Sequence, residues 1–152
     1  MEAIQDFEDF LDLLDRHGVR YLIIGGLAFV YHAKPRFTKD IDIWLDPGPD
    51  NLGRANAALA EFGSPFPLNL SDEDEILQLG VAPNRIDLLR EAAPLAFEDA
   101  WPRRVEGRYG RARANWVAIE DLLAIKERID HPRHREDARV LRLVLERRRG
   151  RG

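Results

Sequence analysis

The sequence predicts an α/β protein in which helices cover a small mixed sheet. Three patterns point to this class. Near the N-terminus, from Ile4 to Leu14, apolar residues recur at three- and four-residue steps, as in an amphipathic helix. Over 40–46 apolar and acidic residues largely alternate, as in a strand with one apolar face. Two further helical patterns, over 119–129 and 137–149, close the chain.

The first 45 residues are expected to form two helices and two strands. The first helix ends at the stop signal His17-Gly18, and the apolar run over 19–24 follows as a buried strand. That strand stops at Gly25-Gly26, after which a short helix closes before Pro35. The alternating strand comes next, and its polar face carries carboxylates.

The rest of the chain continues this alternation. We expect a helix capped by Asp50 or Asn51 and ending at Gly63. The later elements are expected in this order: strands over 75–81 and 85–89 joined by a turn at 82–84, a short helix or turn over 94–101, two weaker strands within 105–117, and two final helices separated by a polar link at 130–134.

Length and composition suit one globular domain. The chain has 152 residues, of which 45% are hydrophobic. We expect a single domain over 1–152, with a sheet-containing core (1–117), a C-terminal helical pair (118–149) and a frayed tail (150–152).

Several classes of protein are excluded. The absence of cysteine rules out a disulfide scaffold, a thiolate metal site and a cysteine nucleophile. Six acidic residues precede the first basic one, Arg16, which is the opposite of a targeting segment. No apolar run approaches the roughly 18 residues of a membrane span, so we predict a cytoplasmic protein with no membrane partner. The net charge of −4 argues against a protein that coats nucleic acid with its whole surface.

Asp40 and Asp42 are the first candidates for chemistry. Residues two apart in a strand point the same way, so their carboxylates lie close together and repel. Such a pair is tolerated on a solvated face, with one group protonated, or around a divalent cation. Magnesium prefers hard oxygen ligands and keeps positions for substrate phosphates, so the pair can form half of a magnesium site.

Asp87 interrupts an otherwise apolar strand. It is either solvated at a sheet edge, in an ordinary ion pair with Arg85 or Arg90, or it faces the same cleft as the first two acids. In the second case three carboxylates can hold two magnesium ions and activate a hydroxyl for attack on an α-phosphate.

Gly25-Gly26 fits a place where backbone amides approach phosphate closely at a helix N-terminus. The chain has neither a Walker loop nor a G-x-G-x-x-G fingerprint. For other residues we expect structural roles. The four histidines are expected at the surface, and Trp44 either in the layer opposite the carboxylates or stacked on a base. Lys126 can also form an ordinary ion pair with Asp130.

The blocks Gly25-Gly26-Leu27-Ala28 and Arg36-Phe37-Thr38-Lys39-Asp40-Ile41-Asp42 resemble the core motif of the polymerase-β-like nucleotidyltransferase superfamily. Within it the chain is most similar to minimal bacterial proteins related to the AbiEii-type toxin–antitoxin nucleotidyltransferases. The likeness continues in Leu122-Leu123-Ala124-Ile125-Lys126 and Asp137, which are similar to the lysine and aspartate helices that close the site in those relatives. It therefore implies the nucleotidyltransferase fold.

The resemblance implies a role for each matched residue. Gly25 and Gly26 would contact the triphosphate, and Arg36 and Thr38 would steady the nucleotide or the strand. The catalytic and metal roles would fall as follows: Asp40 and Asp42 as magnesium ligands, Asp87 as the third carboxylate, Lys126 neutralising phosphate charge, and Asp137 orienting Lys126 or the acceptor. The chain departs from the pattern at Arg133-His134, where relatives often carry Lys-Asp.

The implied activity is magnesium-dependent transfer of a nucleoside monophosphate from an NTP to an acceptor hydroxyl, with release of pyrophosphate. The resemblance favours an RNA end such as that of tRNA as acceptor, and an antitoxin as partner. A protein hydroxyl and a small molecule such as an aminoglycoside stay open as acceptors. A catalytically lapsed fold that only binds nucleotide is the alternative from another class.

Overall fold

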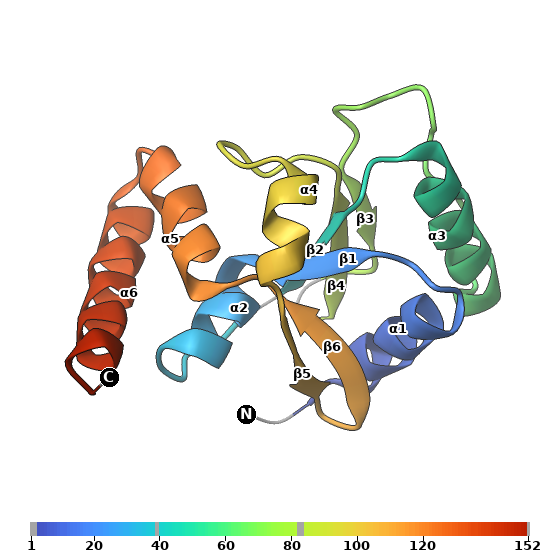
Figure 1. Cartoon of the computed structure of the whole chain (residues 1–152). Helices are drawn as coiled ribbons and strands as arrows, with labels where there is room; N and C mark the ends of the chain where they lie inside the picture. Colours follow the sequence, from blue (N-terminus) through green and yellow to red (C-terminus); the bar gives the residue numbers. More distant parts are fainter. Residues whose placement is uncertain (1–2, 39, 82–83, 152) are drawn as a thin grey trace.

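The structure is a computed structural model that describes residues 3–38, 40–81 and 84–151 (Figure 1). Its helices are α1 (Gln5–Arg16), α2 (Gly25–His32), α3 (Pro49–Phe62), α4 (Phe97–Ala100), α5 (Ile119–Arg128) and α6 (Pro132–Arg151), with a 3-10 turn, η1 (Trp101–Arg103). Its strands are β1 (Tyr21–Ile24), β2 (Asp40–Leu45), β3 (Leu77–Leu79), β4 (Arg85–Leu89), β5 (Val105–Tyr109) and β6 (Ala112–Trp116).

The six strands form one mixed sheet in the order β3-β4-β2-β1-β6-β5. The central pair β1–β2 is antiparallel, whereas β2 pairs with β4, and β1 with β6, in parallel. Antiparallel pairing adds β3 and β5 at the two edges. The predicted class, a small mixed sheet covered by helices, is confirmed.

The helices lie in two groups (Figure 1). Helices α1 and α3 pack together on one side of the molecule, and α5 and α6 form a pair on the opposite side. Helix α2 contacts β2 and also α5 and α6, so it joins the sheet to the C-terminal pair. The apolar residues of α1, α3 and the central strands form one buried cluster. No helix in the described part of the chain has the length and apolar character needed to cross a membrane.

The start of α3 differs from the prediction. The helix begins at Pro49, with Gly48 as its N-cap, so the expected cap at Asp50 or Asn51 was wrong. Proline suits the first helical position because its missing N–H has no partner there in any helix. The Asn51 side chain is buried and instead bonds the backbone of Arg20, which lies just before β1. The backbone N–H and carbonyl of Arg20 are thus bonded to a side chain. Strand β1 begins at the next residue, Tyr21, rather than at residue 19.

The start of α6 also differs. The helix begins at Pro132, five residues before the expected position, and continues to Arg151. Proline again stands at the first helical position, where the sequence had been interpreted as a link. As a result His134 and Asp137 lie three residues apart on one helix. The expected turn at 82–84 lies partly outside the described residues.

Candidate active site

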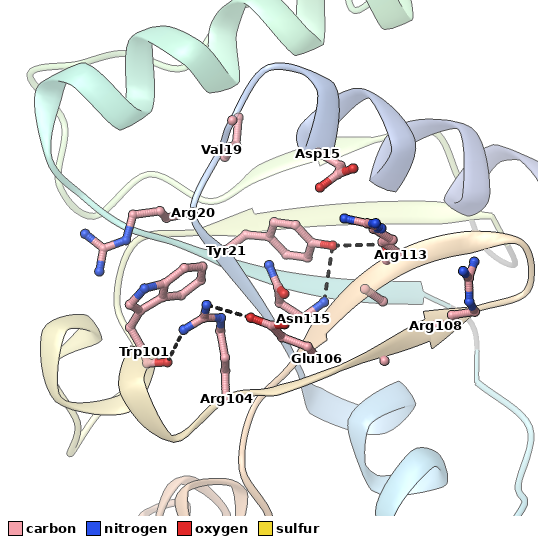
Figure 2. Close-up of a pocket in the computed structure, with 13 residues that line it drawn as sticks. Asp15, Val19, Arg20, Tyr21, Trp101, Arg104, Glu106, Arg108, Arg113 and Asn115 are labelled. Carbon is pink, nitrogen blue, oxygen red and sulfur yellow. Dashed lines mark hydrogen bonds and ion pairs between the residues drawn. The ribbon is translucent and has the colours of Figure 1, made fainter.

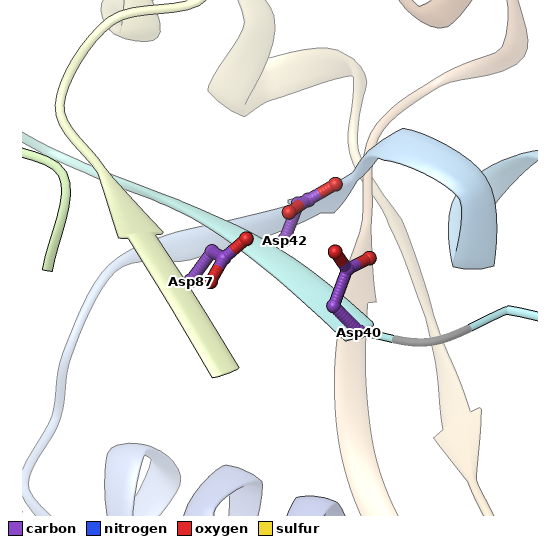
Figure 3. A group of neighbouring side chains, drawn as sticks. All are labelled: Asp40, Asp42 and Asp87. Atoms are coloured by element: carbon purple, nitrogen blue, oxygen red, sulfur yellow. The ribbon is translucent and has the colours of Figure 1, made fainter. Parts of the chain in front are cut away.

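Three carboxylates converge where β2 and β4 run side by side (Figure 3). Asp40 and Asp42 stand on β2 and Asp87 on β4, and the parallel register pairs Asp42 with Asp87. One oxygen from each of the three lies within 4.8 Å of the others. Strand β3 covers the far side of β4, so Asp87 is not at a sheet edge, and its side chain is only 8% exposed. The cluster therefore unites the acids that the sequence singled out.

Three neighbouring carboxylates repel one another, and this repulsion is seen at Asp42. Burial, followed by the nearby charges of Asp40 and Asp87, raises the pKa of Asp42 to about 7. The donor set consists of hard carboxylate oxygens in close array, which is the chemistry that magnesium prefers. The residues present therefore fit a divalent metal.

Arg85 is the resident counterion of the cluster. Its guanidinium pairs with Asp40 at 2.8 Å and with Asp87 at 2.9 Å. The hydrogen bond to Asp87 is the main cause that raises the pKa of Arg85. The expected ion pair of Asp87 with Arg85 is present, but Asp87 is buried beside the other acids and is not solvated at a sheet edge. One guanidinium facing three carboxylates leaves this site acidic.

Gly25 is required by the shape of the turn from β1 into α2. Its φ is +71°, in the left-handed region, and a Cβ there would lie 2.1 Å from Oδ2 of Asp42. At Gly26 a Cβ would meet Thr38 at 3.4 Å. The glycine pair therefore lets the start of α2 approach the acidic strand.

A cavity of about 330 Å³ opens beside the acids. Its lining comes from the start of α2, the segment before β2, β2 itself, and helices α5 and α6: Gly25, Gly26, Arg36, Phe37, Thr38, Asp40, Asp42, Lys126, Arg133 and His134. The expected nucleotide-contacting residues all lie on its wall. Asp87 and Asp137 are not among the lining residues.

Asp137 holds two cations at this wall. Its carboxylate accepts from Lys126 at 3.0 Å and from Arg36 at 2.6 Å, and both Asp137 and Lys126 are only 4% exposed. Burial alone would raise the pKa of Asp137, but the bonds from the two cations outweigh it and lower that pKa. Burial lowers the pKa of Lys126, although Asp137 opposes the change. The expected alternative partner of Lys126, Asp130, pairs with Arg135 instead.

His134 is a site residue that the sequence analysis missed. It was expected at the surface, but it lines the cavity with Nδ1 3.3 Å from Nζ of Lys126. Burial and the charge of Lys126 lower the pKa of His134. An ammonium only donates, so in this contact Nδ1 accepts and Nε2 carries the ring proton. The three-residue spacing from Asp137 could have revealed this position, had the start of α6 been placed correctly.

The expected positions of His32 and Trp44 were also wrong. His32 is buried and bonds the carbonyl oxygen of Val117 at 2.6 Å. Strand alternation places Trp44 on the same side of β2 as Asp42, not in the opposite layer. Trp44 is 1% exposed and packs edge-on against Phe97, so it cannot stack on a base.

Comparison with protein-family models and with curated proteins finds no match. Among solved structures, the chain is similar to ANT(2'')-Ia in its complex with adenylyl-2''-tobramycin, with a TM-score of 0.54 and 18% identity over 91% of this chain and 87% of that one. It is also similar to an antigenic nucleotidyltransferase-like protein from Paracoccidioides brasiliensis, with a TM-score of 0.49 and 15% identity over 95% and 78% of the two chains. The chain therefore has the nucleotidyltransferase fold.

Proposed function

We propose that the protein is a magnesium-dependent nucleotidyltransferase, which moves a nucleoside monophosphate from an NTP to an acceptor hydroxyl and releases pyrophosphate. The observation that carries this proposal is the convergence of Asp40, Asp42 and Asp87 within 4.8 Å, beside a cavity with cationic walls. A cavity lined by both acids and cations suits a metal-bound triphosphate, because the acids can bind the metal and the cations can bind the phosphates.

Asp40, Asp42 and Asp87 would hold the magnesium ions. When bound, magnesium supplies Lewis-acid polarisation of the phosphate and favours the deprotonated acceptor hydroxyl. The protein's own side chains supply the remaining charge stabilisation. Lys126 and Arg36, fixed by Asp137, stabilise negative charge without rearranging, which is the usual source of rate in phosphoryl transfer.

The remaining wall residues orient the nucleotide. Gly25 and Gly26 leave the backbone at the start of α2 open to phosphate oxygens. Thr38 packs against Gly26 and steadies the segment that leads into β2. Nε2–H of His134 offers a neutral donor beside Lys126.

For the acceptor we propose an RNA end such as that of tRNA, in a bacterial toxin–antitoxin setting with an antitoxin as partner in the cytoplasm. The motif resemblance to AbiEii-type proteins supports this choice. The likeness to ANT(2'')-Ia favours an aminoglycoside-type small molecule as the second candidate acceptor.

The first experiment is a thermal-shift panel with each of the four NTPs, with and without magnesium. A ligand at hundredfold excess over its dissociation constant adds about 2.7 kcal/mol of stability. We expect a magnesium-dependent rise in Tm with at least one NTP, lost in Asp40→Asn/Asp42→Asn. The matched control is Asp72→Asn/Asp74→Asn, which removes two exposed acids with the same spacing.

Turnover then separates an enzyme from a lapsed fold. Pyrophosphate release is measured with tRNA and, separately, with an aminoglycoside as acceptor. Release that Asp42→Asn abolishes supports the proposal, and the acceptor that elicits it identifies the substrate class. NTP binding without release under either condition supports the lapsed fold, and no binding at all contradicts the site.

A further inference from the structure

A second cavity lies at the other end of β1 (Figure 2). Its volume is about 590 Å³, against about 330 Å³ for the catalytic cavity, and the two share no lining residue. Arg20 lines the second cavity and Gly25 the first. The five residue steps from Arg20 to Gly25 span roughly 17 Å at about 3.3 Å per residue in a strand. The second cavity is therefore a separate place on the molecule.

Two arginines face each other on its β-hairpin wall. Arg108 on β5 is directly opposite Arg113 on β6 in the antiparallel register, and both side chains are exposed. Like charges at directly opposed positions destabilise an antiparallel pair. Within the described part of the chain neither guanidinium has a carboxylate partner, and Arg108 donates only to the carbonyl of Arg111. Within the described residues, therefore, no ion pair offsets this repulsion.

The floor of the cavity is fixed in place (Figure 2). The guanidinium of Arg104 lies 3.8 Å from the ring centroid of Trp101 and is also held by that residue's carbonyl and by Glu106 at 2.7 Å. Arg20 approaches the ring of Trp101 at 4.8 Å. The wall carries four arginines and two carboxylates, those of Asp15 and Glu106. Arg20 is paired with Asp46 at 3.0 Å and Arg104 with Glu106 at 2.7 Å, so Arg108 and Arg113 are the arginines of this wall without an ion pair among the described residues.

Tyr21 anchors the strand that carries Arg113 (Figure 2). Its hydroxyl accepts from the backbone N–H of Asn115 at 3.3 Å and donates to the carbonyl of Arg113 at 3.4 Å. Tyr21 itself is 2% exposed, so these contacts are rigid. The backbone of Arg113 and Asn115 is therefore held in place, and both residues line the cavity.

We propose that this cavity binds a phosphate group between Arg108 and Arg113, with Asn115 as a neutral donor. Each guanidinium presents a fork of N–H donors, and the several oxygens of a phosphate can accept from two forks at once. The phosphate belongs either to a free polyphosphate or to the backbone of a single-stranded nucleic acid. This site does not depend on the proposed catalysis.

Isothermal titration calorimetry in magnesium-free buffer tests the site with two probes, inorganic tripolyphosphate and a short single-stranded RNA. The test variant is Arg108→Gln/Arg113→Gln. The control, Arg111→Gln/Arg147→Gln, removes two exposed arginines that line neither cavity. We expect wild type and control to bind at least one probe, and the test variant to bind about tenfold more weakly or worse. Equal affinities in all three proteins, or no binding by wild type, would overturn the site.

The location is checked on the wild-type protein, so the result does not depend on how a variant folds. In a ¹H–¹⁵N correlation spectrum, the amides of Gly107 and Asn115 report the second cavity, and those of Gly25 and Gly26 report the catalytic one. Shifts at Gly107 and Asn115 support the proposal, whereas shifts confined to the other pair contradict it. Binding of RNA alone, with a steep salt dependence, identifies a nucleic-acid strand as the source, and binding of tripolyphosphate alone identifies a free polyphosphate.

Discussion

Gly25 and Asp42 lie in such close contact that the glycine has no room for a side chain. A Cβ on Gly25 would come within 2.1 Å of Oδ2 and 2.9 Å of Cγ of the carboxylate. The contact arises because Asp42 pairs with Ile24, the last residue of β1, across the antiparallel ladder. The turn into α2 and the position of the carboxylate are therefore set together.

Gly25→Ala is expected to destabilise the protein by more than the strain of a left-handed residue, which is about 1–2 kcal/mol. The added methyl also displaces the Asp42 carboxylate, so magnesium binding weakens. The matched control is Gly63→Ala, because Gly63 also has a positive φ, +96°, but has open space around its Cα. Urea unfolding of both variants measures the difference. Equal losses of unfolding free energy in the two variants would show that the contact with Asp42 does not affect stability.

In the magnesium-free protein, the titration of Asp42 is expected to contribute a loss of stability as pH rises from about 4 to about 7. The folded pKa of Asp42, about 7, exceeds its value of 3.8 in a free chain, so the folded state holds the extra proton in this window. Stability falls with pH wherever the folded state binds more protons, here by an amount on the order of 1–3 kcal/mol.

Unfolding free energies at several pH values check this dependence. Residue 42 cannot titrate in Asp42→Asn, so the stability of wild type relative to this variant should fall between pH 4 and 7. Because protons and magnesium compete for Asp42, the affinity of wild type for magnesium should rise through the same window. A stability difference between wild type and variant that stays constant over this window would contradict the raised pKa.

Arg85→Gln is expected to tighten magnesium binding by about three- to tenfold and to lower the stability of the magnesium-free protein. The guanidinium occupies oxygens of Asp40 and Asp87 and repels an incoming cation, yet it offsets the mutual repulsion of the acids. Calorimetric titration with magnesium and thermal unfolding measure the two effects. Arg16→Gln, which breaks an exposed ion pair in α1, should change neither the affinity nor the midpoint. Weaker magnesium binding in Arg85→Gln would refute the counterion role.

Asp137→Asn is expected to lower the free energy of unfolding by about 3 kcal/mol or more. The substitution leaves the buried Lys126 without its carboxylate partner and also removes the ion-pair partner of Arg36. Lys126→Met should cost less than half as much, since Asp137 keeps its bond to Arg36. Urea unfolding compares the two variants. If Lys126→Met were the more damaging, the carboxylate would not be the hub of this network.

Strands with clear alternation or dense apolar runs were predictable. The range of β4 matches its prediction, because an apolar run bounded by turn residues admits few alternatives. The starts of α3 and α6 were missed for one reason. In both, proline occupies the first helical position, but the sequence alone also permits a loop there.

The candidate site was predictable where its residues are local in sequence. Asp40 and Asp42 share a strand face, and the glycine pair precedes them by a short helix. The pairing of Asp42 with Asp87 depends on the register of the sheet, which cannot be predicted from local sequence patterns. His134 was missed because its position in the cavity depends on how α6 packs against α5. The contact of Arg85 with two acids likewise exists only once β2 and β4 align.

The Asp137 carboxylate is supplied by α6, late in the chain, yet it fixes Arg36 and Lys126 from earlier elements. During synthesis, therefore, the sheet and its three acids can form while both cations still lack their common anchor. A nascent chain at that stage has the acidic strand pair without an ordered cationic wall. The wall is complete only after Asp137 has been added and α6 has packed against α5.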